Sequence, residues 1–257
     1  MPELPEVETV VRTVAARLKG RRLVKVRCTT RKSWAKSVHK AEGQTIHRVR
    51  RYGKYILLDL EEGLLAIHLG MTGKLLASGS KGPYTRAALE LDDGATVLFD
   101  DVRQFGSARW IRQEPAGLGP DALAVSAGEF LQRLRGRKGK IKPLLLNQSF
   151  LRGLGNIYAD EALFRAGIHP LALAASLSRG RALRLHGAIV EVLSEAVAKG
   201  GSTISDYVDA DGNRGWFQIE HRVYQRAGQP CVDCGTGIRR ILVAQRGTHF
   251  CPRCQRR

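Results

Sequence analysis

The chain has 257 residues, enough for one large domain or two ordinary domains with real hydrophobic cores. It carries 42 Lys and Arg against 24 Asp and Glu, a formal charge of +18, in a sequence that is 43% hydrophobic. This balance excludes a disordered polar chain and indicates a folded protein with a polyanionic partner. No apolar run approaches the ~20 residues of a spanning helix, and the first residues lack the apolar core of a signal peptide. We therefore expect a cytoplasmic protein with nucleic acid, and no membrane, as its partner.

The chain starts Met-Pro-Glu-Leu-Pro-Glu-Val-Glu-Thr. Removal of Met1 would leave Pro2 with a secondary α-amine, a group that titrates near pH ~8 and is partly nucleophilic at neutral pH. Such an amine forms an iminium with an aldehyde, and the iminium acts as an electron sink. Glu3 places a general acid or base beside it. The alternative is that Pro2 only protects the terminus and that Pro5 opens a helix.

The spacing of apolar residues predicts a helix followed by a β-rich region. The valines and leucine from Val7 to Leu18 recur at helical spacing, and Gly20 follows the last of them. Short β-type runs separated by Gly or Asp turns come next, which is typical of a sandwich or barrel. Examples within this region, which extends from about Leu23 to Arg112, are Arg22–Cys28, Thr45–Val49, Tyr55–Leu60, Leu64–Leu69, Ala87–Leu91 and Thr96–Phe99.

A Gly- and Pro-rich stretch at Gln113–Pro120 predicts a domain boundary, and the pattern becomes helical beyond it. Residues 147–170 are predicted as a helix, Gly-rich turns and a second helix with Asn156 at its N-cap. Leu185, Ile189, Val192 and Ala196 form the apolar stripe of a longer helix that ends at Gly200. The polar connection at 200–217 is long enough to favour a functional loop.

Two features of this second half suit phosphate binding. A helix N-terminus at Gly155-Asn156 presents free N–H groups to an anion, although a purely structural helical hairpin remains an alternative. Residues 239–250 are predicted as a β-hairpin with Gln245, Arg246, Gly247 and Thr248 at its tip. An exposed arginine on a rigid hairpin suits phosphate or groove contact, and a solvated charge is the alternative.

Two further motifs place unusual side chains in turns. Met71 stands between glycines in His68-Leu69-Gly70-Met71-Thr72-Gly73, and Arg103 and Phe105 share one side of an extended segment before Gly106. On a basic protein, an exposed Met, Arg and Phe can wedge into a base stack and fill the space of an extruded nucleotide. Ordinary packing of each residue is the alternative.

Four of the five cysteines form two CxxC pairs near the end of the chain, whereas Cys28 stands alone. This spacing predicts one tetrahedral zinc site with the ligands Cys231, Cys234, Cys251 and Cys254. Two disulfides are the alternative, which a reducing compartment disfavours. Four thiolates leave no open coordination position, so the zinc is expected to be structural.

These motifs, in this order from Pro2 to the last cysteine, resemble the bacterial formamidopyrimidine-DNA glycosylases of the Fpg/Nei family. The resemblance implies an α+β fold with three parts. They are an N-terminal β-sandwich with flanking helices over 1–113, a helix–two-turn–helix domain over 120–227 with a lesion loop at 202–217, and a zinc finger over 228–257. It implies base excision repair by a bifunctional glycosylase and AP lyase, which removes oxidised purines such as 8-oxoguanine and cleaves the strand by β,δ-elimination.

The resemblance also implies residue roles. Pro2 matches the Schiff-base nucleophile and Glu3 the proton donor, with Glu6 as a nearby secondary acid. Lys54 matches a phosphate-binding lysine assigned to β-elimination, and Arg246 a zinc-finger arginine assigned to δ-elimination. The matches to DNA-contacting positions are Met71, Arg103 and Phe105 as void-filling residues, Asn156 on phosphate, and Lys142 with Arg137 or Lys138 in a basic stretch.

The sequence departs from the family pattern at two positions. Gln104 stands where a second basic residue is common, which weakens one phosphate contact. Tyr84 stands near the place of a DNA-contacting histidine, so that role is carried over only in part. The implied reaction centre uses protein groups and no cofactor, and the expected partner is duplex DNA with oxidised bases or abasic sites, bound by a monomer associated with the nucleoid.

Two other functions are compatible with parts of the sequence. An endonuclease VIII-like enzyme would apply the same chemistry to oxidised pyrimidines, although the three void-filling residues and the full-length 202–217 loop favour purines. A non-catalytic zinc-ribbon protein would bind DNA without cleaving it, and it leaves Pro2 and Glu3 unexplained.

Overall fold

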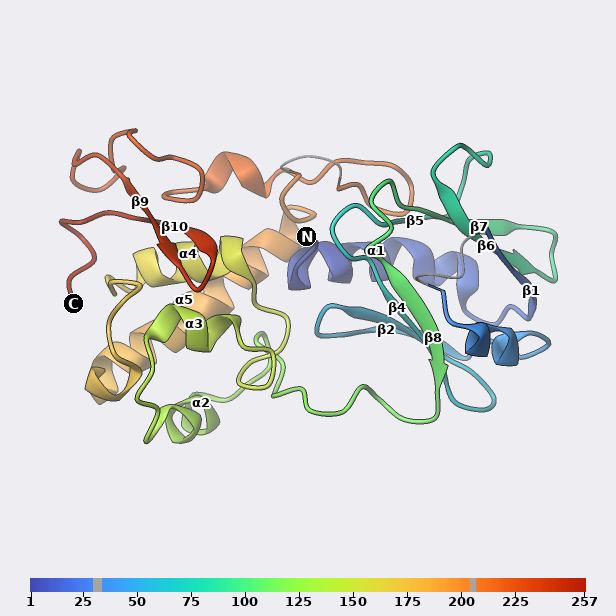
Figure 1. Cartoon of the computed structure of the whole chain (residues 1–257), viewed down its shortest axis with the longest axis horizontal. Helices are drawn as coiled ribbons and strands as arrows, with labels where there is room; N and C mark the ends of the chain where they lie inside the picture. The colour runs from blue at the N-terminus through green and yellow to red at the C-terminus, as the bar shows by residue number, and fades with distance from the viewer. Residues whose placement is uncertain (30–33, 204–206) are drawn as a thin grey trace. The chain divides into compact units, whose positions relative to one another are not determined.

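The computed structural model describes residues 1–29, 34–203 and 207–257. Part of the predicted lesion loop, residues 204–206, lies outside the described residues. The contacts divide the chain into two compact units (Figure 1). Unit 1 contains Met1–Ala116 and Val197–Gln218, and unit 2 contains Gly117–Ala196 and Ile219–Arg257. Among the described helices, none combines the length and the apolar character that a membrane crossing requires.

Unit 1 is built around two four-stranded antiparallel sheets (Figure 1). One sheet has the order β1-β6-β7-β5 and the other the order β2-β3-β4-β8. The strands are β1 (Leu23–Cys28), β2 (Arg48–Tyr52), β3 (Tyr55–Asp59), β4 (Leu64–His68), β5 (Lys74–Leu76), β6 (Thr85–Leu91), β7 (Thr96–Asp100) and β8 (Ser107–Ile111). A short 3-10 helix, η1 (Lys36–Ala41), packs beside β8.

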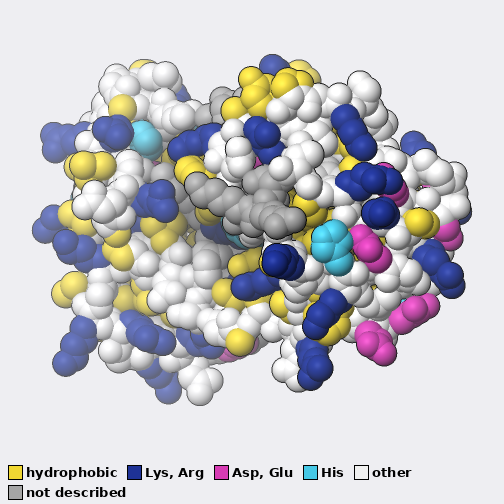
Figure 2. Space-filling view, turned by 45° about the vertical axis from the view of Figure 1, so that its right-hand side comes forward, with side chains coloured by type: hydrophobic (Ala, Val, Ile, Leu, Met, Phe, Trp, Pro, Cys, Tyr) yellow, Lys and Arg dark blue, Asp and Glu magenta, His cyan; other side chains and the backbone are white. Residues whose placement is uncertain are grey.

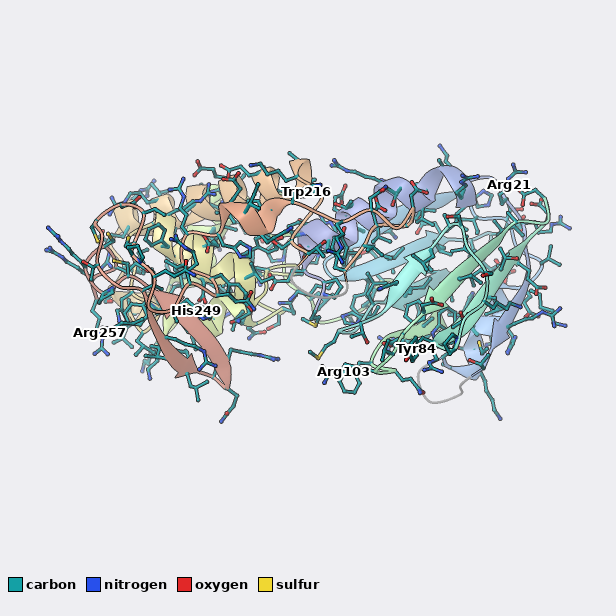
Figure 3. The ribbon with its side chains drawn as sticks, turned by 90° about the horizontal axis from the view of Figure 1, so that it is seen from above. Arg21, Tyr84, Arg103, Trp216, His249 and Arg257 are labelled. Atoms are coloured by element: carbon teal, nitrogen blue, oxygen red, sulfur yellow. The ribbon has the colours of Figure 1, made fainter. Side chains whose placement is uncertain are left out.

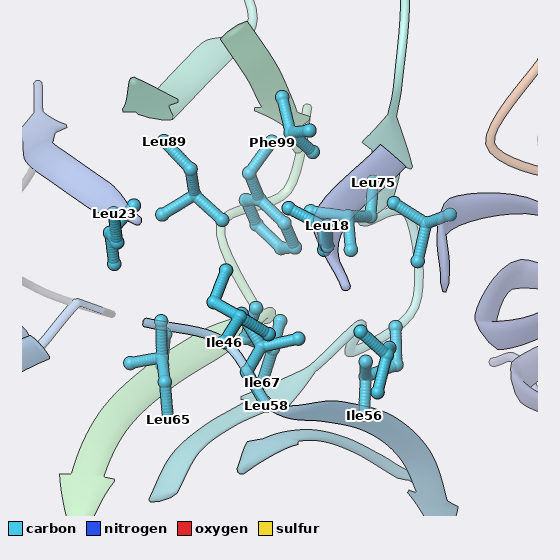
Figure 4. Packing of buried hydrophobic residues seen from close by; sticks show 14 of the residues in the cluster. Leu18, Leu23, Ile46, Ile56, Leu58, Leu65, Ile67, Leu75, Leu89 and Phe99 are labelled. Carbon is cyan, nitrogen blue, oxygen red and sulfur yellow. The ribbon is translucent and has the colours of Figure 1, made fainter. Parts of the chain in front are cut away.

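The facing sides of these sheets bury a shared hydrophobic core (Figure 4). Ile56, Leu58 and Ile67 come from one sheet, and Leu89 and Phe99 come from the other. All five side chains are at most 1% exposed. Each such side chain stabilises the fold by about 1.5–3 kcal/mol relative to an exposed one, so the sandwich is a rigid base for the loops at its edges.

Helix α1 (Leu4–Leu18) closes this core as the spacing predicted. Val7, Val10, Val14 and Leu18 are fully buried, because residues three and four apart share one face of a helix. Gly20 then adopts a positive φ of 80°, which ends the helical path. The first residues of the chain are thereby fixed against the sandwich.

The predicted strands are confirmed with two differences. The segment predicted at 45–49 forms its strand three residues later, as β2, because the arginines of 48–52 pair with β3 in spite of their charge. Strands β5 and β8 lie within the predicted β-rich region but are not among the runs that the spacing identifies. Lys74–Leu76 is too short to show alternation, and β8 carries an exposed Arg109 and a half-buried Trp110.

Unit 2 contains four helices and one hairpin among its described residues. They are α2 (Ala127–Leu134), α3 (Ile141–Leu146), α4 (Asn156–Arg165), α5 (Arg179–Ala198) and the strands β9 (Arg239–Val243) and β10 (Arg246–Phe250). Short 3-10 turns lie at η2 (Ala174–Ser176) and η3 (Phe217–Glu220). The predicted stripe on α5 is confirmed, since Leu185, Ile189, Val192 and Ala196 are at most 1% exposed.

Candidate active site and nucleic-acid interface

The N-terminal turn is held by two glutamates. Glu3 is the N-cap of α1 and Glu6 is its N3 residue, and each side chain accepts the backbone N–H of the other in a capping box. The N–H of Glu3 reaches Oε2 of Glu6 at 2.7 Å, while Oε1 of Glu6 accepts the N–H of Ser202 at 2.8 Å. Pro2 and Glu3 are buried, and Met1 is 52% exposed. The turn therefore presents Pro2 from a rigid backbone, with Met1 outermost.

Lys54 lies on the tight turn that joins β2 to β3. Tyr52 pairs with Tyr55, so Gly53 and Lys54 form a two-residue turn, and Gly53 takes the positive φ of 61° that such a turn needs. Arg51 on β2 donates to Glu8 of α1 at 2.9 Å, which joins this hairpin to the N-terminal helix. Lys54 is 7% exposed, so this cation sits in a largely desolvated position within unit 1.

His68, the last residue of β4, is held neutral beside Lys54. Burial first, and then the nearby charge of Lys54, lower the pKa of His68 to about 4. Its Nδ1 accepts the N–H of Gly70 at 3.1 Å. The neutral ring therefore carries its proton on Nε2, which makes that nitrogen a hydrogen-bond donor at neutral pH. The sequence motif at 68–73 indicates a role for Met71 and gives only one signal for the histidine, its place at the end of an apolar strand.

The loops at one edge of unit 1 present the predicted wedge residues. Met71 is 43% exposed and Phe105 is 55% exposed, and the guanidinium of Arg103 lies over the Phe105 ring at 4.7 Å. Tyr84 is 49% exposed and belongs to the same edge, as Figure 3 shows for Tyr84 and Arg103. Large exposed apolar side chains gathered with an arginine are suited to contact bases.

Gln104, the departure from the family pattern noted in the sequence, also has an unusual backbone conformation. It adopts a φ of 55°, in the left-handed region that a non-glycine residue occupies at a cost of about 1–3 kcal/mol. This conformation turns the chain between Arg103 and Phe105. Strain of this kind persists only where surrounding contacts fix the backbone.

In unit 2, Asn156 does not cap its helix as predicted. The N-cap of α4 is Gly155, and Asn156 is the first helical residue. Its side-chain amide donates to the carbonyl of Gly247 on β10 at 3.0 Å. The prediction failed because glycine also serves as an N-cap and because a distant carbonyl competes for the amide. Asn156 thereby joins the start of α4 to the hairpin.

Lys142 also needs correction, because it is 0% exposed. Its ammonium pairs with Asp160 of α4 at 2.6 Å and donates to Oγ1 of Thr248 on β10 at 2.7 Å. Asp160 in turn accepts the N–H of His249 at 2.8 Å. The basic stretch around Lys142 predicts that this side chain contacts DNA at the surface. Its ammonium instead binds Asp160 and Thr248 inside unit 2, where it holds the hairpin in place. Arg137 in the same stretch is exposed.

Arg246 is exposed and begins strand β10 directly after the hairpin turn. It pairs with Val243, so the turn residues are Ala244 and Gln245 rather than the predicted 245–248. Their φ angles of 49° and 60° match a type I′ turn, which suits the twist of a hairpin. Arg246 therefore projects from a short, ordered hairpin.

The four predicted zinc ligands converge in unit 2. The sulfur atoms of Cys231, Cys234, Cys251 and Cys254 all lie within 4.8 Å of one another. The Cys231–Cys254 and Cys234–Cys251 sulfur pairs are 3.9 and 3.5 Å apart. Four thiolates at about 2.3 Å from a tetrahedral zinc would be separated by about 3.8 Å, so the donor set fits this metal.

Lysine and arginine side chains are spread over the face seen in Figure 2, and acidic side chains are fewer. This distribution agrees with the formal charge of +18. Sequence-independent contact with phosphates draws on such a surface.

Comparisons with known proteins agree with this arrangement. The family model described as the formamidopyrimidine-DNA glycosylase N-terminal domain matches residues 1–108, and that of the formamidopyrimidine-DNA glycosylase H2TH domain matches residues 117–208. A zinc finger found in FPG and IleRS matches residues 228–257. The chain is 53% identical over 266 residues to the formamidopyrimidine-DNA glycosylase of Solibacter usitatus, and the match covers both proteins completely. The chain belongs to the formamidopyrimidine-DNA glycosylase family.

Solved structures of this family superpose closely on the chain. The MutM (Fpg) protein of Thermus thermophilus has a TM-score of 0.91 at 44% identity, covering 99% of this chain and 98% of that one. A variant of the Lactococcus lactis Fpg protein, solved with a Fapy-dG-containing DNA, has a TM-score of 0.91 at 34% identity over all of both chains. Family membership shows an enzyme, a DNA glycosylase of base excision repair, with the α+β fold predicted from the motifs.

Proposed function

We propose that this protein is a bifunctional DNA glycosylase and AP lyase that removes oxidised purines, including 8-oxoguanine and formamidopyrimidines, from duplex DNA. The observation that carries the proposal is the N-terminal turn, in which Pro2 and Glu3 are buried and the backbone of Glu3 is fixed by Glu6. The full-length similarity to a formamidopyrimidine-DNA glycosylase and to an Fpg protein solved with Fapy-dG DNA supports the purine assignment. The substrate would be DNA with an oxidised base or an abasic site, and the protein would act as a monomer.

The proposed chemistry begins at the amine of Pro2, freed by removal of Met1. Its lone pair attacks C1′ of the damaged nucleotide, the glycosidic bond breaks, and the base leaves with the proton that the Pro2 nitrogen gives up. The carboxyl of Glu3 gives a proton to O4′ as the C1′–O4′ bond opens, which leaves an iminium between Pro2 and the open sugar. Each of these steps uses groups of the protein and takes no cofactor.

The iminium then permits strand cleavage. It acidifies the C2′ proton, so loss of that proton expels the 3′ phosphate by β-elimination, and loss of a second proton expels the 5′ phosphate by δ-elimination. Lys54 would bind a phosphate beside the lesion and assist the first elimination. Arg246, exposed at the start of β10, would bind phosphate and assist the second. The product is a gap of one nucleotide.

The remaining site residues would deform and hold the DNA. Extrusion of a nucleotide costs a few kcal/mol, and least for a damaged pair. Met71, Arg103 and Phe105 would fill the space in the stack, while Asn156, Arg137 and Tyr84 would contact the backbone. His68 would add a neutral Nε2–H donor beside Lys54.

We further propose that Cys231, Cys234, Cys251 and Cys254 hold one structural Zn²⁺, since their spacing suits tetrahedral thiolate ligation. The metal would fix the fold of the finger that carries Arg246. The three-part division at 1–113, 120–227 and 228–257 remains our proposal for how these functions are distributed.

Borohydride reduction tests the nucleophile. A duplex with 8-oxoguanine opposite cytosine should yield a covalent protein–DNA adduct, and mass spectrometry should place the sugar on Pro2. Pro2→Gly or a chain that retains Met1 should lose most of the adduct. Pro115→Gly, outside the proposed site, should trap as the unaltered chain does. Attachment of the sugar to a lysine would refute the proposed mechanism.

A panel of single-lesion duplexes tests the specificity. Faster cleavage at 8-oxoguanine than at thymine glycol is expected. The reverse order would identify an endonuclease VIII-like enzyme for oxidised pyrimidines. Binding with no cleavage of any lesion would identify a non-catalytic DNA-binding protein.

A further inference from the structure

Three loops carry the exposed residues at the wedge edge of unit 1, and all of them form hydrogen bonds with one buried residue. Met71 and Thr72 lie between β4 and β5, Tyr84 precedes β6, and Arg103 and Phe105 lie between β7 and β8. Asp101, directly after β7, is 1% exposed. Neither the motifs nor the proposed reaction gives this residue a role.

Both oxygens of the Asp101 carboxylate accept hydrogen bonds from the loops. Oδ1 accepts from the hydroxyl of Thr72 at 2.5 Å and from the N–H of Arg103 at 3.2 Å. Oδ2 accepts from the N–H of Gly106 at 2.7 Å. The side chain therefore joins the Met71 loop to both ends of the Arg103–Gly106 turn.

The backbone of Asp101 connects the third loop. Its N–H donates to the carbonyl of Tyr84 at 2.9 Å, and its carbonyl accepts from Nε of Arg86 at 2.9 Å. The Arg86 guanidinium in turn lies 6.0 Å from the centre of the Tyr84 ring. One residue is thus bonded to all three loops.

The Met71 loop and the Arg103–Gly106 turn are packed closely against each other. A Cβ added at Gly70 would lie 2.4 Å from the backbone of Phe105 and Gly106. Between Arg103 and Gly106, whose N–H groups both bind Asp101, Gln104 is kept in the left-handed region. A strained residue of this kind needs surroundings that fix it, and the carboxylate supplies fixed points on either side.

We propose that Asp101 is a positioning residue that holds Met71, Arg103 and Phe105 as one rigid wedge, so that its carboxylate sets how efficiently a damaged base is extruded. This inference rests on the proposed function, because it assumes that these side chains enter the DNA. If these side chains shifted when they entered the DNA, their contacts would offset little of the free energy that unstacking the bases costs. Asp101 touches no reacting atom, and its effect is therefore confined to substrates that still carry a base to extrude.

The test compares Asp101→Asn with Asp100→Asn in the full-length, zinc-loaded protein. Asp101→Asn puts an NH₂ group against an N–H donor, which leaves a buried donor unsatisfied. Asp100, by contrast, accepts from the Thr85 hydroxyl at 2.6 Å and contacts none of the wedge residues in the bonds described above. We expect cleavage of the 8-oxoguanine duplex to fall about tenfold or more in Asp101→Asn. Cleavage of a preformed abasic site should fall much less, and Asp100→Asn should match the unaltered protein on both substrates.

A second pair of variants covers the case in which Asp101→Asn does not fold. Thr72→Val removes the hydroxyl that binds Asp101, while Thr72→Ser keeps it. The fluorescence rise of a 2-aminopurine beside the lesion, which reports unstacking, should be slowed by Thr72→Val and not by Thr72→Ser.

Three results would overturn the inference. Equal rates for Asp101→Asn and Asp100→Asn would remove any role for the carboxylate. If Asp101→Asn loses lesion cleavage, abasic-site cleavage and thermal stability in parallel, the role of Asp101 is merely structural. Equal effects of Thr72→Val and Thr72→Ser would lead to the same conclusion. Failure of the unaltered protein to cleave any lesion would refute the proposed function itself, which separates the two hypotheses.

Discussion

The backbone N–H of Glu3 donates to the Glu6 carboxylate at 2.7 Å, and the same carboxylate accepts the N–H of Ser202 at 2.8 Å. Glu6 is 2% exposed, so both bonds are shielded from water. The residue that fixes the turn is therefore three positions removed from the proposed proton donor, and it is itself fixed by the segment that contains Ser202.

We expect Glu6→Gln to destabilise the protein by about 1–3 kcal/mol, because an amide replaces one acceptor with a donor that faces an N–H group. Urea denaturation measures this change, and borohydride trapping should slow as Pro2 loses its fixed position. Glu61→Gln, on the exposed turn after β3, should change stability by less than about 0.5 kcal/mol. A Glu6→Gln variant with unaltered stability and trapping would contradict the role given to this carboxylate.

Removal of one partner from the Lys142–Asp160 pair should lower the free energy of unfolding by about 3–5 kcal/mol, because the remaining charge is buried without a partner of opposite charge. Thermal unfolding of Lys142→Met measures the loss, and Lys142→Met combined with Asp160→Asn should recover part of it. Lys138→Met provides an exposed control. If Lys142→Met instead leaves stability unchanged and weakens DNA binding, the ammonium contacts DNA directly and is not held inside unit 2.

Arg246→Ala should leave stability nearly unchanged, because the side chain is exposed. The logarithm of the DNA-binding constant falls linearly with the logarithm of the salt concentration. We expect the magnitude of this slope to decrease by about one, because a single phosphate contact is lost. Products of β-elimination should accumulate at the expense of β,δ-elimination on a sequencing gel. Arg239→Ala, exposed on the other strand of the hairpin, is the matched control for general charge, and an equal product shift there would contradict a specific role.

His68 should titrate in NMR spectra with a midpoint near 4 rather than near 6.5. The folded pKa lies below the unfolded one, so the stability linked to this group is present above about pH 6.5 and is lost as the pH falls toward 4, by at most about 3 kcal/mol. Denaturation at pH 7 and pH 4.5 in the unaltered protein and in His68→Gln measures that difference. A midpoint near 6.5 would show that the imidazole is not desolvated beside Lys54.

Metal analysis should find about one zinc per chain, and Cys231→Ser should lose it together with the protection of the β9–β10 amides from hydrogen exchange. Cys28→Ser should retain the metal, because Cys28 lies in unit 1 and outside the four-cysteine set. Full protection of the hairpin after complete chelation would show that the finger folds without metal.

The parts of the fold that could be predicted are those with local signals. The stripe on α1, the paired CxxC motifs and the glycine turns each depend on neighbours a few residues away. Lys142 and Asn156 could not be placed from sequence, because their partners Asp160, Thr248 and Gly247 approach only in the folded chain. The same holds for Asp101, whose importance arises from three loops that are separate in sequence.

The bond between Glu6 and Ser202 joins residues 196 positions apart. Two further bonds tie α1 to the same late segment, from the Tyr207 hydroxyl to the Glu6 carbonyl and from the N–H of Ala210 to the Thr13 hydroxyl. During synthesis, the first helix leaves the ribosome long before these partners exist, and contacts of such sequence separation form late and slowly. A nascent chain therefore completes the hydrogen bonds of its N-terminal helix only after residues 202–210 have been translated.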